Sequence, residues 1–254
     1  MEQFERRQKI AEYINERSKM KVGELARLLE VSEVTIRADL ADLEAKGLLS
    51  RVHGGAVSSY KTYYNMDMQQ RLAANRESKE RIAEKVAEMI EDHDTVMLNS
   101  GTTTLTILRR IPAGLTLNIV TNSIAIALEA AGNPNYNVIL LGGSVNARYQ
   151  FVYGDTAAAQ LKGYHADKLI LSVDGISAEN GFTTYYDKEA ELDRLMLAGA
   201  ATRIVAADSG KLGRTAFAHI APLQAADYIV TNAGSAAEED LAELQETVSR
   251  LITV

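Results

Sequence analysis

The chain has 254 residues, a formal net charge of -7, no Cys and no Trp, and 46% of its residues are apolar. This composition excludes a disordered chain, a disulfide scaffold and any site built on a cysteine thiolate. The charged N-terminus lacks the apolar core of a signal peptide, and no stretch reaches the about 18 apolar residues of a membrane-spanning helix. We therefore expect a cytoplasmic protein.

The charge is unevenly distributed along the chain. Residues 1–57 contain ten basic and ten acidic side chains, which leaves 17 of the 27 basic and 24 of the 34 acidic residues for the remainder. Because the whole negative excess lies after Val57, the acidic total does not exclude nucleic-acid binding by the first segment. We predict a first domain at 1–57, a linker at 58–66 and a second domain at 67–254.

The first domain has the pattern of three helices followed by a β-hairpin. Apolar residues at helical spacing predict helices at 3–17, 22–30 and 33–46. Ser32 is the predicted N-cap of the third helix, and Gly47 its end. Two short helices joined this tightly are typical of a helix-turn-helix. Residues 48–57 predict a β-ribbon wing with a tight Gly-Gly turn.

The third helix has two distinct faces. Ile36, Leu40 and Leu43 form an apolar stripe toward the core. A recognition helix points its N-terminal residues toward base edges in the major groove, where Arg37 would bind guanine in bidentate fashion. The candidate DNA-binding residues of helix and wing are Ser32, Val34, Thr35, Arg37, Ala38, Arg51, His53 and Gly54. The alternative is a three-helix domain that contacts protein and leaves Arg37 in solvent.

The second domain begins with a predicted long helix at 67–91, after which strands and helices alternate. Strands are predicted at 95–99, 117–121, 137–141, 168–174, 203–207, 228–231 and 251–254. Helices are predicted at 103–110, 123–131, 154–161, 188–201 and 236–249. The strands lack strict alternation, as expected for strands covered on both faces. The fold class is therefore α/β, an N-terminal winged helix-turn-helix followed by a three-layer domain with a mainly parallel sheet.

Polar or glycine-rich turns follow five of the predicted strands. The turn at 99–104 opens a helix, and its glycine, free N–H groups and Thr hydroxyls predict an anion site. If the strands are parallel, all five turns meet at the edge where open α/β sheets bind ligands, and Lys211 supplies a positive charge there. The candidate ligand-binding residues are Asn99, Ser100, Gly101, Thr102, Thr103, Thr121, Asn122, Gly142, Gly143, Asp174, Gly175 and Lys211. Each feature alone also fits a helix cap, a chain turn or a solvated lysine.

The motifs of both halves resemble one known family. The sequence VSEVTIRADL at 31–40, with GLL at 47–49 and RVHGGA at 51–56, is similar to the DNA-binding signature of the DeoR family of bacterial sugar-operon regulators. SGTT at 100–103, DGI at 174–176 and DSGKLG at 208–213 are similar to motifs of the family's sensor domain, and the similar pair Glu189–Ala190 adds Glu189 to the candidate ligand-binding residues. The chain departs from the family pattern at Ala38, where a basic residue is common, at Asn99, where Asp is usual, and at Gly210, where Ser is usual.

The resemblance implies a transcriptional regulator, mostly a repressor in this family, whose α/β domain resembles ribose-5-phosphate isomerase and binds a phosphorylated sugar. The implied partners are an operator of double-stranded DNA, a phosphorylated sugar effector and further copies of the chain in a dimer or tetramer. The histidines lack metal-ligand spacing, and we expect neither a metal nor a cofactor. Two alternatives stay open. One is an isomerase-like enzyme, although Ser177 replaces an acid of the isomerases, and the other is a ligand-free dimerisation module; we expect a regulator rather than an enzyme.

Overall fold

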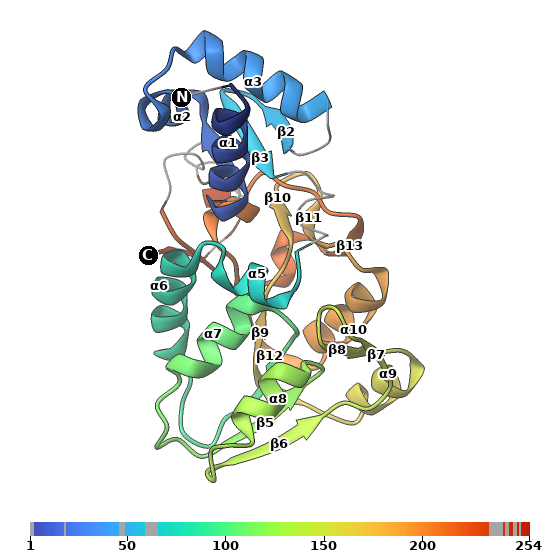
Figure 1. Ribbon diagram of the computed structural model, residues 1–254. Coiled ribbons are helices and arrows are strands. Elements are labelled where there is room, and N and C mark those ends of the chain that lie inside the picture. The colour runs from blue at the N-terminus through green and yellow to red at the C-terminus, as the bar shows by residue number, and fades with distance from the viewer. Residues whose placement is uncertain are drawn as a thin grey trace. The chain divides into compact units, whose positions relative to one another are not determined.

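The chain divides into two compact units, Met1–Arg76 and Glu77–Val254. The computed structural model (Figure 1) describes residues 3–17, 19–45, 49–58, 66–233, 241, 244–245, 248 and 250–254. Gly47, most of the predicted linker and most of the predicted helix at 236–249 lie outside these residues. The division after Arg76 places the segment 67–76 in the first unit, whereas the sequence pattern groups it with the second domain.

The first unit contains the three predicted helices and a small sheet. The helices are α1 (Gln3–Arg17), α2 (Val22–Leu29) and α3 (Glu33–Ala45). The wing strands are β2 (Leu49–Val52) and β3 (Gly55–Ser58), and an additional strand, β1 (Lys19–Lys21), pairs with β3 where we expected only the end of a helix. The sheet is antiparallel in the order β1-β3-β2. Its core joins residues of all three helices and the sheet, among them Ile14, Leu25, Leu40 and Leu49.

The turn of the wing lies one residue earlier than predicted. Val52 pairs with Gly55, so the two turn residues are His53 and Gly54, and Gly54 has the left-handed φ of 72° that favours glycine. Gly55 belongs to β3 instead. A Cβ at Gly55 would lie 2.3 Å from the carbonyl oxygen of Met20, so β1 can approach β3 only because this residue has no side chain.

The predicted long helix at 67–91 is two helices, α5 (Met68–Ala73) and α6 (Arg76–Ala87). Asp67 caps α5 through its side chain, which accepts the Gln70 backbone N–H at 2.9 Å. Ala74 is extended and Asn75 has a φ of 53°, a left-handed conformation that asparagine tolerates better than most residues. The backbone is therefore not helical at Ala74 and Asn75. The prediction of one continuous helix at 67–91 is wrong.

The second unit is built on one seven-stranded sheet whose neighbouring strands are all parallel. Its order is β15-β14-β12-β9-β4-β5-β6. The strands are β4 (Thr95–Leu98), β5 (Leu117–Thr121), β6 (Tyr136–Leu140), β9 (Ala166–Leu171), β12 (Ala200–Ala206), β14 (Tyr228–Thr231) and β15 (Leu251–Thr253). All seven predicted strands are confirmed, with ends shifted by a few residues.

Helices cover both faces of this sheet. They are α7 (Thr102–Arg110), α8 (Ile124–Ala130), α9 (Asp155–Leu161) and α10 (Asp187–Ala198). From β4 the chain adds strands toward β6, and from β9 it adds them in the opposite direction toward β15. Right-handed crossovers then place α7 and α8 on one face and α10 on the other, which confirms three layers. The strand order reverses between β4 and β9, the position where open sheets bind ligands.

Several short strands and turns were not predicted. β7 (Ser144–Asn146) and β8 (Phe151–Tyr153) form a hairpin, and β10 (Gly175–Ser177), β11 (Gly181–Thr184) and β13 (Ala218–Ala221) form an antiparallel sheet in the order β10-β11-β13. Two 3-10 turns occur at Ser209–Lys211 and Leu223–Ala225. In the described part of the chain, no helix combines the length and apolar character needed to span a membrane.

Candidate functional site

The N-terminal turn of α3 is held by local hydrogen bonds and presents small apolar groups to solvent. Ser32 Oγ accepts the Thr35 backbone N–H at 3.1 Å and lies 2.9 Å from Thr35 Oγ1, as the N-cap prediction requires. Val34 is 78% exposed, and Ala38, one turn later, is exposed as well. Apolar groups at the start of a recognition helix suit contact with thymine methyl groups.

Arg37 extends into solvent from the same turn of α3. Its side chain is 63% exposed, and its Nη2 donates to Glu33 Oε2 at 3.0 Å. An exposed pair of this kind, four residues apart on one helix, contributes only about 0.3–0.5 kcal/mol. The guanidinium can therefore exchange this carboxylate for a base edge at little cost.

The predicted wing residues Arg51, His53 and Gly54 are all exposed. Arg51 Nε donates to Glu44 Oε2 at 2.8 Å, and the other two residues form the tip of the wing. The first unit (Met1–Arg76), called the head from here on, thus has an exposed helix start and an exposed β-ribbon. These are the two elements that a winged helix-turn-helix applies to duplex DNA.

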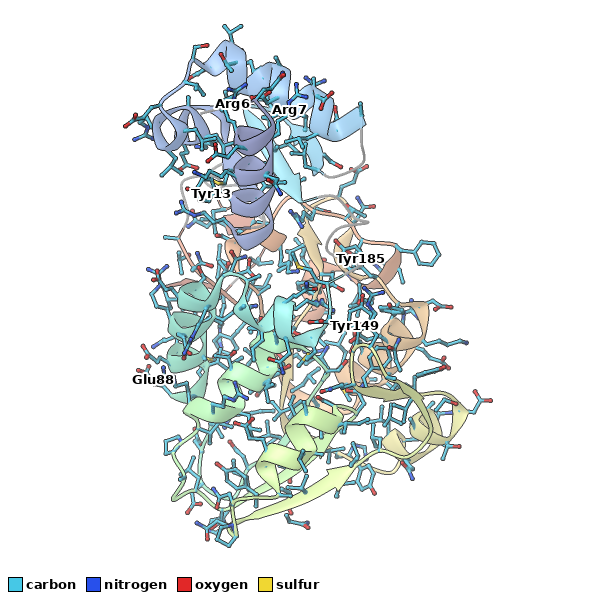
Figure 2. All side chains as sticks on the ribbon, viewed as in Figure 1. Arg6, Arg7, Tyr13, Glu88, Tyr149 and Tyr185 are labelled. Atoms are coloured by element: carbon cyan, nitrogen blue, oxygen red, sulfur yellow. The ribbon has the colours of Figure 1, made fainter. Side chains whose placement is uncertain are left out.

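A buried ion-pair cluster holds α3 against α1. Asp39 is 1% exposed and accepts Arg6 Nε at 2.6 Å and Arg7 Nε at 2.8 Å. Figure 2 labels the two arginines, which belong to α1. Arg7 Nη1 also donates to Asp42 Oδ2 at 2.7 Å. Burial alone raises the pKa of Asp39, but the hydrogen bonds and charges of Arg6 and Arg7 outweigh it, so the pKa lies below its ordinary value. The ionised carboxylate therefore fixes the recognition helix from its inner side.

In the second unit, the turn after β4 lies at the switch point of the sheet, the place between β4 and β9 where the strand order reverses. A Cβ at Gly101 would lie 1.9 Å from Ser172 Oγ, so a larger residue in this turn would have to displace the Ser172 hydroxyl next to the end of β9. Thr102 and Thr103 open α7 and are buried. The first N–H groups of a helix have no partner within it, so this turn offers backbone donors together with Thr hydroxyls.

Four predicted residues from separate segments meet through Thr184, which was not predicted. Ser100 Oγ donates to Glu189 Oε1 at 2.5 Å, and Thr184 Oγ1 lies 2.9 Å from Glu189 Oε2 and 3.1 Å from Asp174 Oδ2. Lys211 Nζ lies 3.5 Å from Asp174 Oδ1. All five side chains are at least nine-tenths buried. The turns after β4, β9 and β12 therefore converge on one polar cluster with α10.

Asn99 links this cluster to a further carboxylate, Asp193. Its Nδ2 donates to Asp193 Oδ1 at 3.1 Å and to the Ser172 carbonyl at 2.9 Å. Burial, and then the charge of Glu189, raise the pKa of Asp193 well above its ordinary value, although the Asn99 hydrogen bond opposes them. An aspartate at position 99 would bring another carboxylate against Asp193. Asn99 is one of the departures from the family pattern. Its neutral amide donates a hydrogen bond to Asp193 without placing a second negative charge beside it.

The raised pKa of Asp193 predicts a pH dependence of stability. In the unfolded chain Asp193 ionises at its ordinary pKa, whereas in the folded chain it keeps its proton to higher pH. Its contribution to stability is therefore complete below the ordinary pKa and is lost as the pH rises toward the folded pKa. Asp193→Asn cannot ionise, so we expect its melting temperature to fall less than that of the wild type from mildly acidic to mildly alkaline pH. Parallel melting profiles for the two proteins would contradict this expectation.

The remaining predicted residues contact several other segments of the unit. Thr121 Oγ1 donates to the Leu98 carbonyl at 2.7 Å, and Asn122 Nδ2 lies 3.4 Å from the Val152 carbonyl. The Gly142 N–H donates to Gln160 Oε1 at 2.7 Å. Gly143 and Gly175 lie at close backbone approaches, where a Cβ would come within 2.5 Å of the carbonyl oxygens of Tyr153 and Arg214, respectively. The three hydrogen bonds tie these turns to β4, β8 and α9.

Aromatic side chains of the β7–β8 hairpin pack beside the start of α10. The Tyr149 and Tyr186 rings lie 4.9 Å apart, and the Phe151 and Tyr186 rings lie 5.8 Å apart, both edge to face. Tyr149 and Phe151 are buried. Because Tyr186 is the residue before α10, this packing supports the helix that carries Glu189 and Asp193.

Sequence reasoning did not include Thr184 and Asp193 among the candidate site residues. Thr184 lies in a short strand that had no periodic signal. Asp193 follows Glu189 by four residues, so a helix over 188–201 already places both carboxylates on one face. That spacing is the signal that identifies Asp193 from sequence.

A winged helix-turn-helix and a separate α/β unit with a buried polar site at its switch point define a DNA-binding transcriptional regulator with a sensor domain. Residues 6–62 match the family model described as DeoR-like helix-turn-helix domain, and residues 74–233 match the one described as DeoR C terminal sensor domain. The chain belongs to the DeoR family of transcriptional regulators.

Named relatives agree with this assignment. The chain is 35% identical to the uncharacterized HTH-type transcriptional regulator YulB of Bacillus subtilis, over 91% of this chain and 89% of that protein. It is 35% identical to a putative aga operon transcriptional repressor of Escherichia coli (92% and 88%) and 31% identical to the lactose phosphotransferase system repressor of Streptococcus mutans (91% and 93%). Among solved structures, ribose 5-phosphate isomerase A of Methanocaldococcus jannaschii is similar over 54% of each chain, with 14% identity and a TM-score of 0.40.

Proposed function

We propose that this regulator represses a sugar-utilisation operon and that a phosphorylated sugar bound at the switch point of the α/β unit controls its DNA binding. One observation carries the proposal, the buried cluster of Ser100, Thr184, Glu189, Asp174 and Lys211 at the carboxyl ends of the strands. The names of two relatives support it: one in Escherichia coli is a putative operon repressor, and one in Streptococcus mutans is the repressor of a lactose phosphotransferase system.

The phosphate is proposed to bind at the first turn of α7. The backbone N–H groups of Thr102 and Thr103 and the positive end of the helix favour an anion. Gly101 leaves no side chain between this turn and the end of β9. Lys211, which pairs with Asp174 at 3.5 Å, is the proposed cation of the phosphate, so ligand binding would exchange a carboxylate for a phosphate at its ammonium.

The sugar hydroxyls are proposed to bind the carboxylate and amide oxygens around Glu189. Two buried oxygen atoms have no hydrogen-bond partner among the described residues: Asp193 Oδ2, whose carboxyl lies close enough to Glu189 for that charge to raise its pKa, and Asn122 Oδ1, in the turn after β5. Buried polar atoms without a partner are costly, and a hydroxyl-rich ligand would accept from a protonated Asp193 and donate to Asn122. Asp174 and Glu189, which share the Thr184 hydroxyl, and Asn99, which donates to Asp193, would complete the contacts.

In the head, the proposed DNA contacts are base contacts from Val34, Thr35, Arg37 and Ala38 and backbone or minor-groove contacts from Ser32, Arg51, His53 and Gly54. We propose a homo-oligomer that places two heads on a palindromic or repeated operator. For the effector to act, it must bind one arrangement of the oligomer better than the other, and a tenfold preference corresponds to about 1.4 kcal/mol per site.

The proposed role of Lys211 as the phosphate partner is tested by comparing how much a ligand stabilises the wild type, a Lys211 variant and a control variant. A thermal-shift screen of phosphorylated sugars on the full chain should identify a ligand that, at about 100 times its Kd, adds about 2.7 kcal/mol to the wild type. Lys211→Met should lose most of this increment, because the ligand phosphate loses its cation. Lys188→Met, which removes an exposed lysine from α10, should keep it. Equal increments in the three proteins would reject Lys211 as the phosphate partner.

The same screen separates the alternatives. A sensor binds the sugar phosphate without converting it, whereas an isomerase-like enzyme interconverts aldose and ketose phosphates with a carboxylate such as Glu189 as base. Product analysis after incubation with the full chain distinguishes these two. A dimerisation module without a ligand would give no thermal shift with any sugar phosphate.

A further inference from the structure

The outer strand of the wing is fastened to the recognition helix by a single carboxylate. β2 lies at the edge of the order β1-β3-β2, so among the described residues no strand pairs with the other side of its backbone. On that side the Arg51 backbone N–H donates to Glu44 Oε1 at 2.7 Å. The other oxygen, Glu44 Oε2, accepts Arg51 Nε at 2.8 Å. One side chain of α3 therefore holds both the backbone and the side chain of one wing residue.

This arrangement fixes the direction of the Arg51 guanidinium. Only Nε is used by Glu44, which leaves Nη1 and Nη2 on the far side of the planar group for another acceptor. Hydrogen bonds from the Arg51 backbone N–H and then from its guanidinium lower the pKa of Glu44 below its ordinary value, so the carboxylate stays ionised. The planar fork suits a phosphate oxygen or a base edge in the minor groove.

The pair Glu33–Arg37 provides a contrast. It joins residues four apart on the same helix through one contact of 3.0 Å, and it fixes no second element. Glu44 and Arg51 are seven residues apart and belong to a helix and a strand. Their two bonds therefore set the position of β2 against α3, which a pair within one helix cannot do.

We propose that Glu44 is a positioning residue for DNA binding, which holds the wing on the recognition helix and aims Arg51 at the duplex. The inference rests on the proposed contact of Arg51 with DNA and goes beyond it, because Glu44 itself touches no DNA. It also predicts that removing an acidic residue lowers the affinity for DNA. An acid beside a duplex repels phosphate, so removing a merely solvated glutamate tightens binding. Removing a positioning glutamate weakens it.

The test uses the full chain and a duplex that the wild type selects from a random library. Glu44→Gln keeps the size of the side chain and removes its charge, and Glu44→Asp keeps the charge but is one methylene too short to reach both donors. We expect each to weaken binding about tenfold, the effect of one charge-assisted hydrogen bond. In an Arg51→Gln background, each substitution should weaken binding less than it does in the wild type, because the part of the effect that acts through the guanidinium is already lost while the backbone bond to Glu44 remains.

Glu30→Gln is the matched control for charge. It removes an exposed acid that lies in the turn before α3, so it should leave binding unchanged or tighten it. Equal or tighter binding by Glu44→Gln together with weaker binding by Arg51→Gln would overturn the positioning role and leave the wing contact intact. Unchanged binding by Arg51→Gln would overturn the wing contact, and with it the inference. Failure of the wild type to select any duplex would overturn the proposed function instead.

Hydrogen exchange gives a readout that needs no DNA. The Arg51 amide is held by Glu44 Oε1, so it should exchange faster in Glu44→Asp than in the wild type, while the amides of β3 that pair with β1 keep their protection. Unchanged exchange at Arg51 in Glu44→Asp would contradict the proposed fastening of the wing.

Discussion

Asp39→Asn is expected to unfold the DNA-binding head while the α/β unit stays folded. The substitution removes the buried carboxylate that Arg6 and Arg7 share and leaves their partly buried guanidinium groups without it. Breaking a buried ion pair by removing one partner costs about 3–5 kcal/mol. Whole domains are stable by only about 5–15 kcal/mol, and a head of this size lies toward the lower end. Hydrogen exchange resolved along the sequence should show lost protection in α1 and α3 and unchanged protection in the large sheet.

Asp42→Asn is the matched control, since Asp42 accepts from Arg7 in the same cluster but its side chain is 35% exposed. A single exposed pair contributes up to about 1 kcal/mol, so the head should stay folded. The lowered pKa of Asp39 adds a pH signature. Its stabilisation is present above the pKa of the unfolded chain and is lost as the pH falls through the folded pKa, so acid should unfold the head. Equal protection of the head in the Asn variants of Asp39 and Asp42 would refute the central role of this ion pair.

Arg37→Ala is expected to remove most of the discrimination between the operator and random DNA without affecting the fold. One bidentate contact with guanine is worth about 1–3 kcal/mol, a factor of about 5 to 150 in affinity. Because Arg37 is exposed and contacts only Glu33 among the described residues, its loss should change stability by less than about 0.5 kcal/mol. Fluorescence anisotropy with the selected duplex and with a random duplex measures the ratio of the two affinities.

Arg27→Ala is a control with the same loss of charge. Arg27 is an exposed residue of α2, and its Nε donates to the Gly23 carbonyl. If it reaches DNA at all, it does so at a phosphate, which carries no sequence information, so any weakening should be shared by both duplexes. An Arg37→Ala variant that keeps the wild-type ratio of affinities would show that Arg37 does not read bases.

The sequence predicts the large elements of this fold because they bury continuous apolar surface. All seven parallel strands are apolar runs, and all are confirmed. The short strands β7, β8, β10, β11 and β13 have only three or four residues, and their pairing depends on tertiary contacts that no local pattern records. The break between α5 and α6 also escapes prediction, because neither Gly nor Pro marks it and Asn75 adopts its left-handed conformation only in context.

The sequence also predicts the part of the candidate site that lies in the turns after the parallel strands, but not the part that lies in the short strands. The turns containing Ser100, Asp174 and Lys211 follow strands, and parallel pairing brings such turns together whatever the details of packing. Thr184, which connects Asp174 to Glu189, lies in one of the short strands and so could not be placed. The two glycines of the wing look alike in sequence. Their different roles depend on β1, whose Met20 carbonyl leaves no room for a Cβ at Gly55.

The central claim is that a sugar phosphate in the α/β unit controls the DNA binding of the head. It is tested most directly by titrating the complex of the full chain and its selected duplex with phosphorylated sugars and with the same sugars lacking phosphate. We expect one phosphorylated sugar to change the affinity for DNA about tenfold or more, and its unphosphorylated form to have no effect at the same concentration. An affinity that no sugar phosphate changes, or one that the sugar without phosphate changes equally, would contradict the claim.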